Sequence, residues 1–146
     1  MIAFGPIPSR RLGQSLGVNH IPPKSCTYDC VYCQVGPTAA TEVRRREFHQ
    51  PEEVLASVAE RVASVRERGG CIDYVSFVPD GEPTLDDHLA EEIAAVRALG
   101  IPVAVISNGS LAWRADVRAD LREADLVCVK GDAVDEEIWR RVNRPS

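Results

Sequence analysis

The sequence lacks the features that define several classes of protein. No apolar run approaches the ~18–20 residues that a membrane-spanning helix needs, so no membrane partner is expected. Residues 1–6 have neither the basic start nor the apolar core of a secretory signal, which favours a cytoplasmic location. No Gly-x-Gly-x-x-Gly turn follows the first expected strand, which argues against a Rossmann-type dinucleotide site.

An excess of basic residues is also missing. The 146 residues include 22 acidic and 17 basic side chains, which gives a formal net charge of −5. Broad nucleic-acid binding relies on phosphate neutralisation by Lys and Arg, so this balance argues weakly against it without excluding a local basic patch. Apolar residues make up 45% and charged residues 27%, as in an ordinary globular domain, which excludes a disordered chain, a collagen-like repeat and a coiled coil.

What is present from residue 51 onward is an alternation of helix and strand patterns. Helices are expected over residues 51–68, 84–99, 113–121 and 135–142, and strands over residues 16–20, 74–78, 103–106 and 126–130. Thr84, followed by Asp87, resembles a capping box that opens the second helix. The last two strands are continuous apolar runs of the kind buried on both faces of a sheet.

This alternation predicts an α/β fold with a parallel sheet, preceded by an extended, proline-containing segment. A complete eight-fold barrel has ~250 residues, so the chain is too short for one. The sequence also stops soon after its last helix has begun, with no closing strand. We therefore expect residues 1–146 to be one domain, truncated at the C-terminus.

Three of the five cysteines lie on one short segment, as Cys26, Cys30 and Cys33 in a Cys-x3-Cys-x2-Cys arrangement. An odd cysteine count without an export signal favours metal or redox use over disulfides. Three thiolates can hold three irons of a 4Fe–4S cluster and leave the fourth iron open to a substrate or cofactor.

Three other interpretations of this segment remain open. Cys30 and Cys33 alone could form a thioredoxin-like redox pair, which leaves Cys26 unexplained. A structural zinc site could add a histidine, either His20 or His49. A ferredoxin-like cluster could recruit Cys71 or Cys128, although both lie beside expected strands and are expected to be small buried residues.

The cysteine segment, with Tyr32 directly before its last cysteine, resembles the signature of the radical SAM superfamily. The resemblance implies an iron–sulfur oxidoreductase in which the open iron of a 4Fe–4S cluster binds S-adenosylmethionine. Reductive cleavage of that cofactor then yields a 5′-deoxyadenosyl radical, with the electron supplied by an external flavodoxin or ferredoxin. It also implies a partial TIM barrel, here its N-terminal portion of about four βα units, and places Tyr32 near the adenine or, alternatively, in packing.

Later turns match what this resemblance requires. Gly81, Glu82 and Pro83 resemble the superfamily's glycine-glycine-glutamate motif, with Asp80 in place of the first glycine. The resemblance implies that Glu82, with its neighbours, receives the amino group of the cofactor, whereas an ordinary strand-to-helix turn is the structural alternative.

Polar residues also follow the next two strands. Asn108 is expected at the carboxyl edge of the sheet, where it could reach a ribose or carboxylate or simply serve a turn. Lys130, at the end of an apolar strand, needs water or an anion at its tip, so a cofactor carboxylate is a candidate partner.

The segment from Gly5 to Gly13, together with these motifs, resembles a bacterial and archaeal subfamily related to the wybutosine (tRNA base) synthesis enzymes. This resemblance suggests a tRNA base as substrate. Arg10 and Arg11 could then bind a phosphate of the cofactor or RNA, although an adjacent basic pair is usually solvated surface. The rival interpretation, from another class, is a non-catalytic zinc-binding or electron-transfer module.

Overall fold

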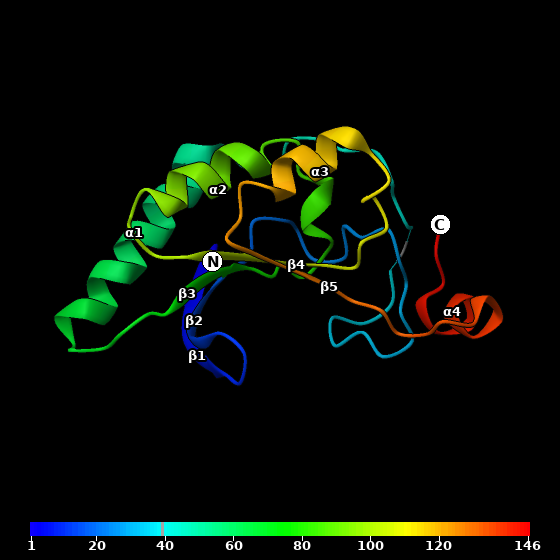
Figure 1. The fold of residues 1–146 in the computed structure, drawn as a ribbon, viewed down its shortest axis with the longest axis horizontal. Coiled ribbons are helices and arrows are strands. Elements are labelled where there is room, and N and C mark those ends of the chain that lie inside the picture. The colour runs from blue at the N-terminus through cyan, green and yellow to red at the C-terminus, as the bar shows by residue number, and fades with distance from the viewer. Residues whose placement is uncertain (39) are drawn as a thin grey trace.

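The structure is a computed structural model that describes residues 1–38 and 40–146. Five strands form one sheet in the order β1-β2-β3-β4-β5 (Figure 1). The strands from β2 to β5 run parallel to their neighbours, whereas β1 is antiparallel to β2. The predicted α/β fold with a parallel sheet, of the kind found in a partial barrel, is therefore confirmed. Within the described ranges, no helix is both long and apolar enough to cross a membrane.

The N-terminal segment forms a hairpin of β1 (Ala3–Ser9) and β2 (Gly13–Val18). The sequence analysis expected only an extended segment before the first strand, so β1 was missed. Its prolines Pro6 and Pro8 are compatible with a strand at the sheet edge, where a missing N–H leaves no central ladder bond unmade. Gly17 leaves room for the Phe4 ring, because a Cβ at this position would lie 2.1 Å from it.

Three helices cover one face of the sheet (Figure 1). They are α1 (Pro51–Glu67), α2 (Leu89–Arg97) and α3 (Ala115–Leu121), and they alternate with β3 (Tyr74–Phe77), β4 (Val103–Ser107) and β5 (Leu126–Val129). The main core lies between this layer and the sheet. It contains, among others, Leu16, Val58, Phe77, Ile93 and Val105, whose burial removes apolar surface from water.

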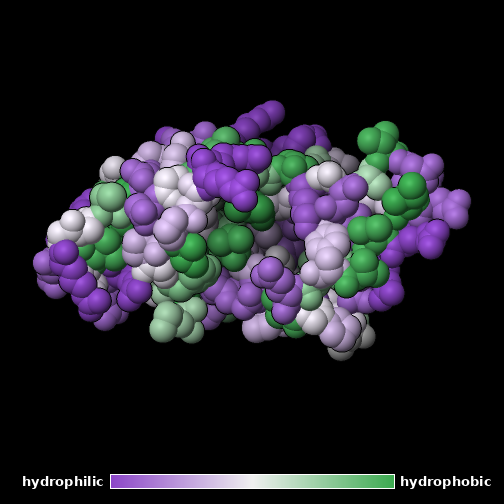
Figure 2. Space-filling model, turned by 90° about the horizontal axis from the view of Figure 1, so that it is seen from below, coloured by the Kyte–Doolittle hydropathy of each residue, from purple (hydrophilic) through white to green (hydrophobic). Residues whose placement is uncertain are grey.

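The uncovered face of the sheet is seen in Figure 2, where hydrophobic and hydrophilic side chains are interspersed. The last helix, α4 (Glu136–Asn143), lies beyond the end of β5 rather than over the sheet (Figure 1). As expected, Asp135 caps this helix, its carboxylate accepting a hydrogen bond from the Ile138 N–H at 3.0 Å.

Two expected boundaries were wrong. Thr84 does not open α2; a short 3-10 helix, η1 (Pro83–Leu85), comes first, and α2 begins at Leu89. The helical conformation is interrupted at Asp86, whose carboxylate accepts a hydrogen bond from the His88 N–H at 2.9 Å. Trp113 precedes α3 and is exposed rather than packed on its inner face.

The expected burial was right for β4 and wrong at two other places. Burial of β4 on both faces of the sheet is confirmed, since only Ile106 of this strand is partly exposed. By contrast, β5 is half-buried or exposed throughout, because it lies at the sheet edge. Cys71, in the loop before β3, is exposed, and Cys128 on β5 is half-buried, so neither is the small core residue expected.

Candidate functional site

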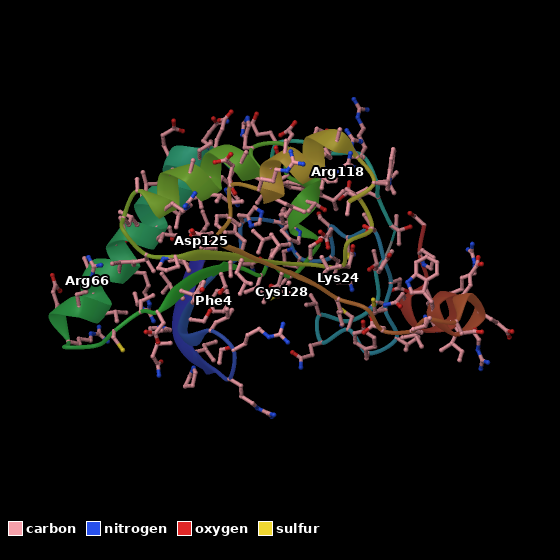
Figure 3. All side chains as sticks on the ribbon, in the orientation of Figure 1. Phe4, Lys24, Arg66, Arg118, Asp125 and Cys128 are labelled. Carbon is pink, nitrogen blue, oxygen red and sulfur yellow. The ribbon has the colours of Figure 1, made fainter. Side chains whose placement is uncertain are left out.

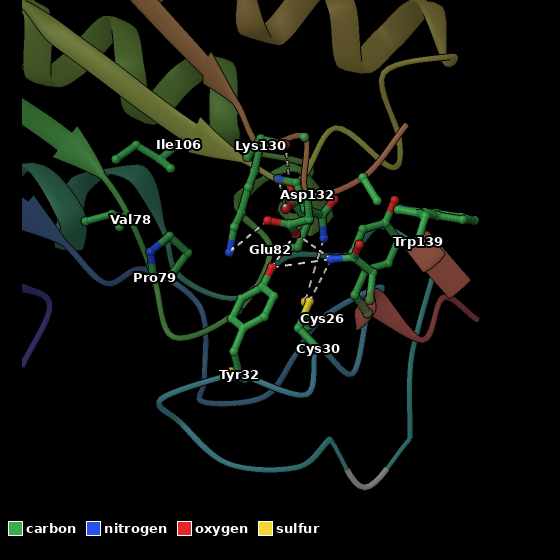
Figure 4. A pocket seen from close by; sticks show the side chains of 18 residues that line it. Cys26, Cys30, Tyr32, Val78, Pro79, Glu82, Ile106, Lys130, Asp132 and Trp139 are labelled. Carbon is green, nitrogen blue, oxygen red and sulfur yellow. Dashed lines mark hydrogen bonds and ion pairs between the residues drawn. The ribbon is translucent and has the colours of Figure 1, made fainter. Parts of the chain in front are cut away.

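The three clustered cysteines lie in residues 24–38, the cysteine loop, which crosses the carboxyl ends of the parallel strands. Cys26, Cys30 and Cys33 are all half-buried and line one cavity of about 280 Å³. The other walls come from the ends of β3, β4 and β5 and from α4 (Figure 4). Figure 3 shows Lys24, on the same loop, near this end of the sheet and Arg66 of α1 at the other.

Each cysteine sulfur has its own nitrogen donor. The Asn108 amide donates to Cys26 Sγ at 3.8 Å, and the Asn143 amide donates to Cys30 Sγ at 3.3 Å. The Lys24 ammonium donates to Cys33 Sγ at 3.3 Å. Burial raises the pKa of the Cys26 thiol, so a hydrogen-bond donor or a bound metal is what favours its thiolate form.

This donor set fits a 4Fe–4S cluster better than a single ion. All three cysteines are described, and their sulfur atoms do not all lie within 4.8 Å of one another. On one tetrahedral zinc ion with Zn–S bonds of about 2.3 Å, the sulfurs would be only about 3.8 Å apart. A cluster spreads its thiolate ligands over several irons and therefore accepts wider spacing.

Glu82, in the turn between β3 and η1, is 2% exposed and lies against this cavity. Its Oε1 accepts hydrogen bonds from the Ser107 hydroxyl at 2.6 Å and from the Thr84 hydroxyl and N–H at 2.7 and 3.2 Å. Its Oε2 accepts one from the Asn108 N–H at 2.8 Å. Burial raises the pKa of Glu82, and these four hydrogen bonds act in the opposite direction.

The turn around Glu82 is pressed against the cysteine loop. The Glu82 N–H donates to the Ser25 carbonyl at 2.9 Å, and the Lys24 N–H donates to the Asp80 carbonyl at 2.9 Å. A Cβ on Gly81 would lie 2.2 Å from the Ser25 carbonyl oxygen, so this position requires glycine. Asp80 is accommodated where the superfamily has its first glycine, because its side chain turns outward and pairs with Asn19.

Asn108, as predicted, lies at the carboxyl edge of β4, where it binds the cysteine loop. Its amide donates to the Thr27 hydroxyl at 2.8 Å, and its carbonyl accepts from the Ser110 N–H at 2.9 Å. The backbone N–H of the same residue binds Glu82, so Asn108 connects the two motifs.

Tyr32 and Lys130 meet at the mouth of the cavity (Figure 4). The Lys130 Nζ lies 3.8 Å from the Tyr32 ring centroid and 3.8 Å from Asp132 Oδ1. The Tyr32 hydroxyl donates to Asp132, whose Oδ2 also accepts from the Asn143 amide at 2.6 Å. Burial, the Asp132 carboxylate and the nearby Cys30 raise the pKa of Tyr32, which keeps its hydroxyl protonated.

Sequence reasoning missed three residues of this site, namely Lys24, Asp132 and Asn143. Lys24 and Asp132 are close in sequence to expected site residues, which was the available signal. Asn143 gave none, because its contacts with Cys30 and Tyr32 span 113 and 111 residues.

The remaining candidates lie elsewhere. Cys71 and Cys128 do not line the cavity, and the Arg11 guanidinium donates to Cys128 Sγ at 3.5 Å. Arg10 and Arg11 are exposed on the hairpin connection, as solvated surface residues would be. His49 lies in an exposed contact with Glu53, and His20 is fully buried and does not line the cavity.

Comparison with known proteins identifies the family of this chain. Residues 21–146 match the Radical SAM superfamily, which covers the cysteine loop and every strand from β3 onward. The chain belongs to the radical SAM superfamily. Members of this superfamily are characterised by a 4Fe–4S cluster and S-adenosylmethionine, and they generally need an external reductant.

Relatives of this superfamily member are longer proteins. A UPF0026 protein of Methanocaldococcus jannaschii is 56% identical over 144 residues, which cover 99% of this chain and 44% of the relative. A UPF0026 protein of Helicobacter pylori is 35% identical over 147 residues, which cover 99% of the chain and 46% of the relative. The chain thus spans less than half the length of these relatives.

The fold resembles that of TYW1. A structure of TYW1 with a lysine–pyruvate adduct bound superposes with a TM-score of 0.64 over 90% of this chain and 46% of that one, at 22% identity. A crystal structure of archaeal TYW1 gives 0.54 over 86% and 44%, at 21% identity. At this identity the similarity concerns the fold alone.

Proposed function

We propose that residues 1–146 are the cofactor-binding part of a radical SAM enzyme, with Cys26, Cys30 and Cys33 as the three cluster ligands. The observation that carries this proposal is the convergence of these thiols on one cavity at the carboxyl ends of the strands. When bound there, a reduced 4Fe–4S cluster with S-adenosylmethionine supplies a 5′-deoxyadenosyl radical. The chain itself provides position, hydrogen bonds and the cavity that the cysteines line.

Within this proposal, three side chains tune the ligands. Amide N–H groups of Asn108 and Asn143 and the ammonium group of Lys24 point at the three sulfurs. Donors to a thiolate stabilise its negative charge and raise the potential of a cluster that it holds. Asn143 and Lys24 therefore act through the ligands, as positioning residues.

Glu82 receives the amino group of the cofactor through Oε2. Its Oε1 already accepts three hydrogen bonds, whereas Oε2 accepts only the one from Asn108 and retains a lone pair. Gly81 and Pro83 shape the turn that holds this carboxylate at the cavity wall. Asn108 is a secondary contact, since its side chain lies between the cysteine loop and β4.

Tyr32 and Lys130 close the other side of the cavity. The Tyr32 ring is held from one face by the Lys130 ammonium and at its hydroxyl by Asp132, which leaves a fixed aromatic surface for the adenine. Lys130 is 48% exposed at its side chain, so its ammonium can turn to the carboxylate of the cofactor.

Two alternatives from another class are disfavoured by placement. A ferredoxin-like site needs a fourth thiolate, yet neither Cys71 nor Cys128 lines the cavity. A zinc site that recruits His20 or His49 needs an imidazole beside the cysteines, and neither histidine is among the residues that line it. An external one-electron donor of the flavodoxin or ferredoxin type completes the proposed reaction.

For the substrate, the likeness to TYW1 favours an RNA base, and the net charge of −5 gives this no support. Incubation of the reconstituted protein with tRNA, cofactor and reductant tests this part separately. The proposal expects a modified tRNA nucleoside in digests; production of 5′-deoxyadenosine without any change in tRNA would contradict the substrate class alone.

Anaerobic reconstitution tests the cofactor assignment. We expect about four irons and four sulfides per chain, and release of 5′-deoxyadenosine when S-adenosylmethionine and a strong reductant are added. Cys30→Ala should abolish cluster assembly, whereas Cys71→Ala, outside the cavity, should not. One tightly held zinc ion without this product, or equal iron loss in both variants, would overturn the assignment.

A further inference from the structure

A second group of ligand-type side chains lies away from the cavity, between the sheet and α2. His20 follows β2, Asp86 follows η1, and Glu92 is on the first turns of α2. All three are fully buried and none lines the cysteine cavity. His20 also packs edge-on against Phe77 of β3, with ring centroids 5.0 Å apart.

Five polar atoms of these side chains are buried and have no hydrogen-bond partner among the residues that the structure describes. They are both ring nitrogens of His20, Oδ2 of Asp86 and both carboxylate oxygens of Glu92. The closest approach between His20 and Glu92 is 3.8 Å from Nε2 to Oε2, which is too long for a hydrogen bond. Buried polar groups are almost always satisfied in native proteins, so this concentration calls for a common partner.

The geometry of the group suits one metal ion. One ligand atom from each residue lies within 4.8 Å of the other two. Three such atoms are all within about 2.8 Å of one central point, and zinc binds nitrogen and carboxylate oxygen at about 2.0–2.2 Å. Side-chain adjustments of under ~1 Å would therefore complete the coordination.

The charge of this ligand set also suits a divalent cation. Two ionised carboxylates and a neutral imidazole together carry a charge of −2, which one divalent ion balances.

We propose that His20, Asp86 and Glu92 bind one divalent transition-metal ion, such as zinc, in a structural site separate from the cysteine loop. Nitrogen and oxygen ligands together favour zinc, and a bidentate Glu92 supplies the fourth coordination position. The second oxygen of Asp86 is already oriented by the His88 N–H at 2.9 Å. Backbone carbonyls of Pro83 and Val18 lie near the His20 ring, where they can accept its other N–H.

The proposed ion joins three elements immediately behind the Glu82 turn. Asp86 directly follows η1, which Glu82 caps through the Thr84 N–H. A metal there fixes the end of β2, the turn and α2 relative to one another. Because the site is fully buried, the ion must be present when the chain folds.

Zinc content tests the proposal without any reference to activity. The protein is prepared with Cys26, Cys30 and Cys33 all replaced by Ala, so that the cysteine loop cannot bind zinc, and is refolded with zinc chloride. After desalting we expect about one zinc per chain by elemental analysis. Glu92→Gln in this background should lose it, whereas the exposed neighbour variant Glu91→Gln should keep it.

Thermal stability provides a second measurement on the same proteins. Zinc should raise the melting temperature of the parent protein, which has the three cysteine substitutions and retains Glu92. It should leave the melting temperature of Glu92→Leu in the same background unchanged. With EDTA present, Glu92→Leu should melt at a higher temperature than its parent, because it removes two unpartnered oxygens. The proposal would be overturned if the parent protein held no more zinc than Glu92→Gln and zinc did not change its melting temperature.

Discussion

At the scale of single residues, Gly81 has the most restricted position in the site. Gly81 lies in the turn after β3, against the Ser25 carbonyl. A Cβ at this position would lie 2.2 Å from the Ser25 carbonyl oxygen. Because that neighbour is backbone, it cannot rotate away. Substitution must therefore push the cysteine loop outward and break the Glu82 N–H bond to Ser25.

We expect Gly81→Ala to fold but to retain less than about half of the iron of the wild-type protein after reconstitution, since the loop that carries Cys26 is displaced. Iron and sulfide analysis measures this. Asp80→Ala is the matched control, because Asp80 contacts the loop through its backbone carbonyl and should leave iron content unchanged. Full iron content in Gly81→Ala would show that the close approach is unimportant.

Glu82 contributes to stability independently of any cofactor. Each oxygen of Glu82 accepts a hydrogen bond from a backbone N–H, that of Thr84 at Oε1 and that of Asn108 at Oε2. Because a backbone N–H cannot accept, an amide NH₂ in place of either oxygen faces another donor. Glu82→Gln should destabilise the protein by about 1–3 kcal/mol, measured by urea denaturation. Glu60→Gln, exposed on α1, should change the stability by less than about 0.5 kcal/mol. Equal midpoints for both variants would contradict this account of Glu82.

At the scale of elements, charged side chains connect α3 to the segments around it. Arg45, 8% exposed at its side chain, donates to the carbonyls of Thr84 and Asp86 and pairs with Asp116 and Asp120 on α3. Asp116 also accepts two hydrogen bonds from Arg114 at 3.0 and 2.8 Å. The Arg114 guanidinium holds the pKa of Asp116 well below its usual 3.8.

This pKa has a definite consequence for stability. A carboxyl group whose pKa is lower in the folded than in the unfolded protein stabilises the fold above pH 3.8, and loses that effect as the pH falls further. Asp116→Asn should therefore be less stable than wild type at pH 7, with the difference in urea midpoint shrinking below about pH 4. Glu67→Gln, on α1, should show no such trend; a difference for Asp116→Asn that is constant with pH would contradict the assignment.

The elements also show how far sequence reasoning reaches. Helix α1 was predicted because Val54, Val58 and Val62 repeat on one face, and local periodicity needs no tertiary information. The strand β1 was not, because Pro6 and Pro8 are tolerated only through its place at the edge of the sheet. The break between η1 and α2 depends on the side chains of Glu82 and Asp86, which a capping pattern at Thr84 could not indicate.

In the site, the same distinction separates what was predicted from what was missed. The cysteines and Glu82 were predicted from local motifs that resemble those of the radical SAM superfamily, and Asn108 and Lys130 from their places at the ends of strands. The structure places all of them around one cavity. Asp132 and Asn143 complete the network around Tyr32 and Cys30 through contacts that span 100 and 113 residues. A contact between segments 100 or more residues apart leaves no local pattern in the sequence.

At the scale of the whole molecule, α4 depends on the cysteine loop more than on the core. The Val31 N–H donates to the Val142 carbonyl at 2.9 Å, and the Asp29 N–H donates to the Asn143 carbonyl at 3.1 Å. The rings of Tyr28 and Trp139 meet edge-on with centroids 5.8 Å apart. Helix α1, by contrast, packs its buried valines into the main core, far from this loop.

Ordering of the loop should therefore propagate to α4 and stop there. We expect cluster reconstitution to slow amide hydrogen exchange across Glu136–Asn143 by about tenfold, since opening of α4 then requires a loop held by three ligands to move. Exchange across Pro51–Glu67 should not change, which provides an internal control in the same mass-spectrometry experiment. Cys30→Ala, treated identically, should show no slowing in α4. Equal slowing in both helices would mean that the cluster stabilises the whole fold rather than this contact, and no slowing in either would mean that α4 does not pack on the loop as described.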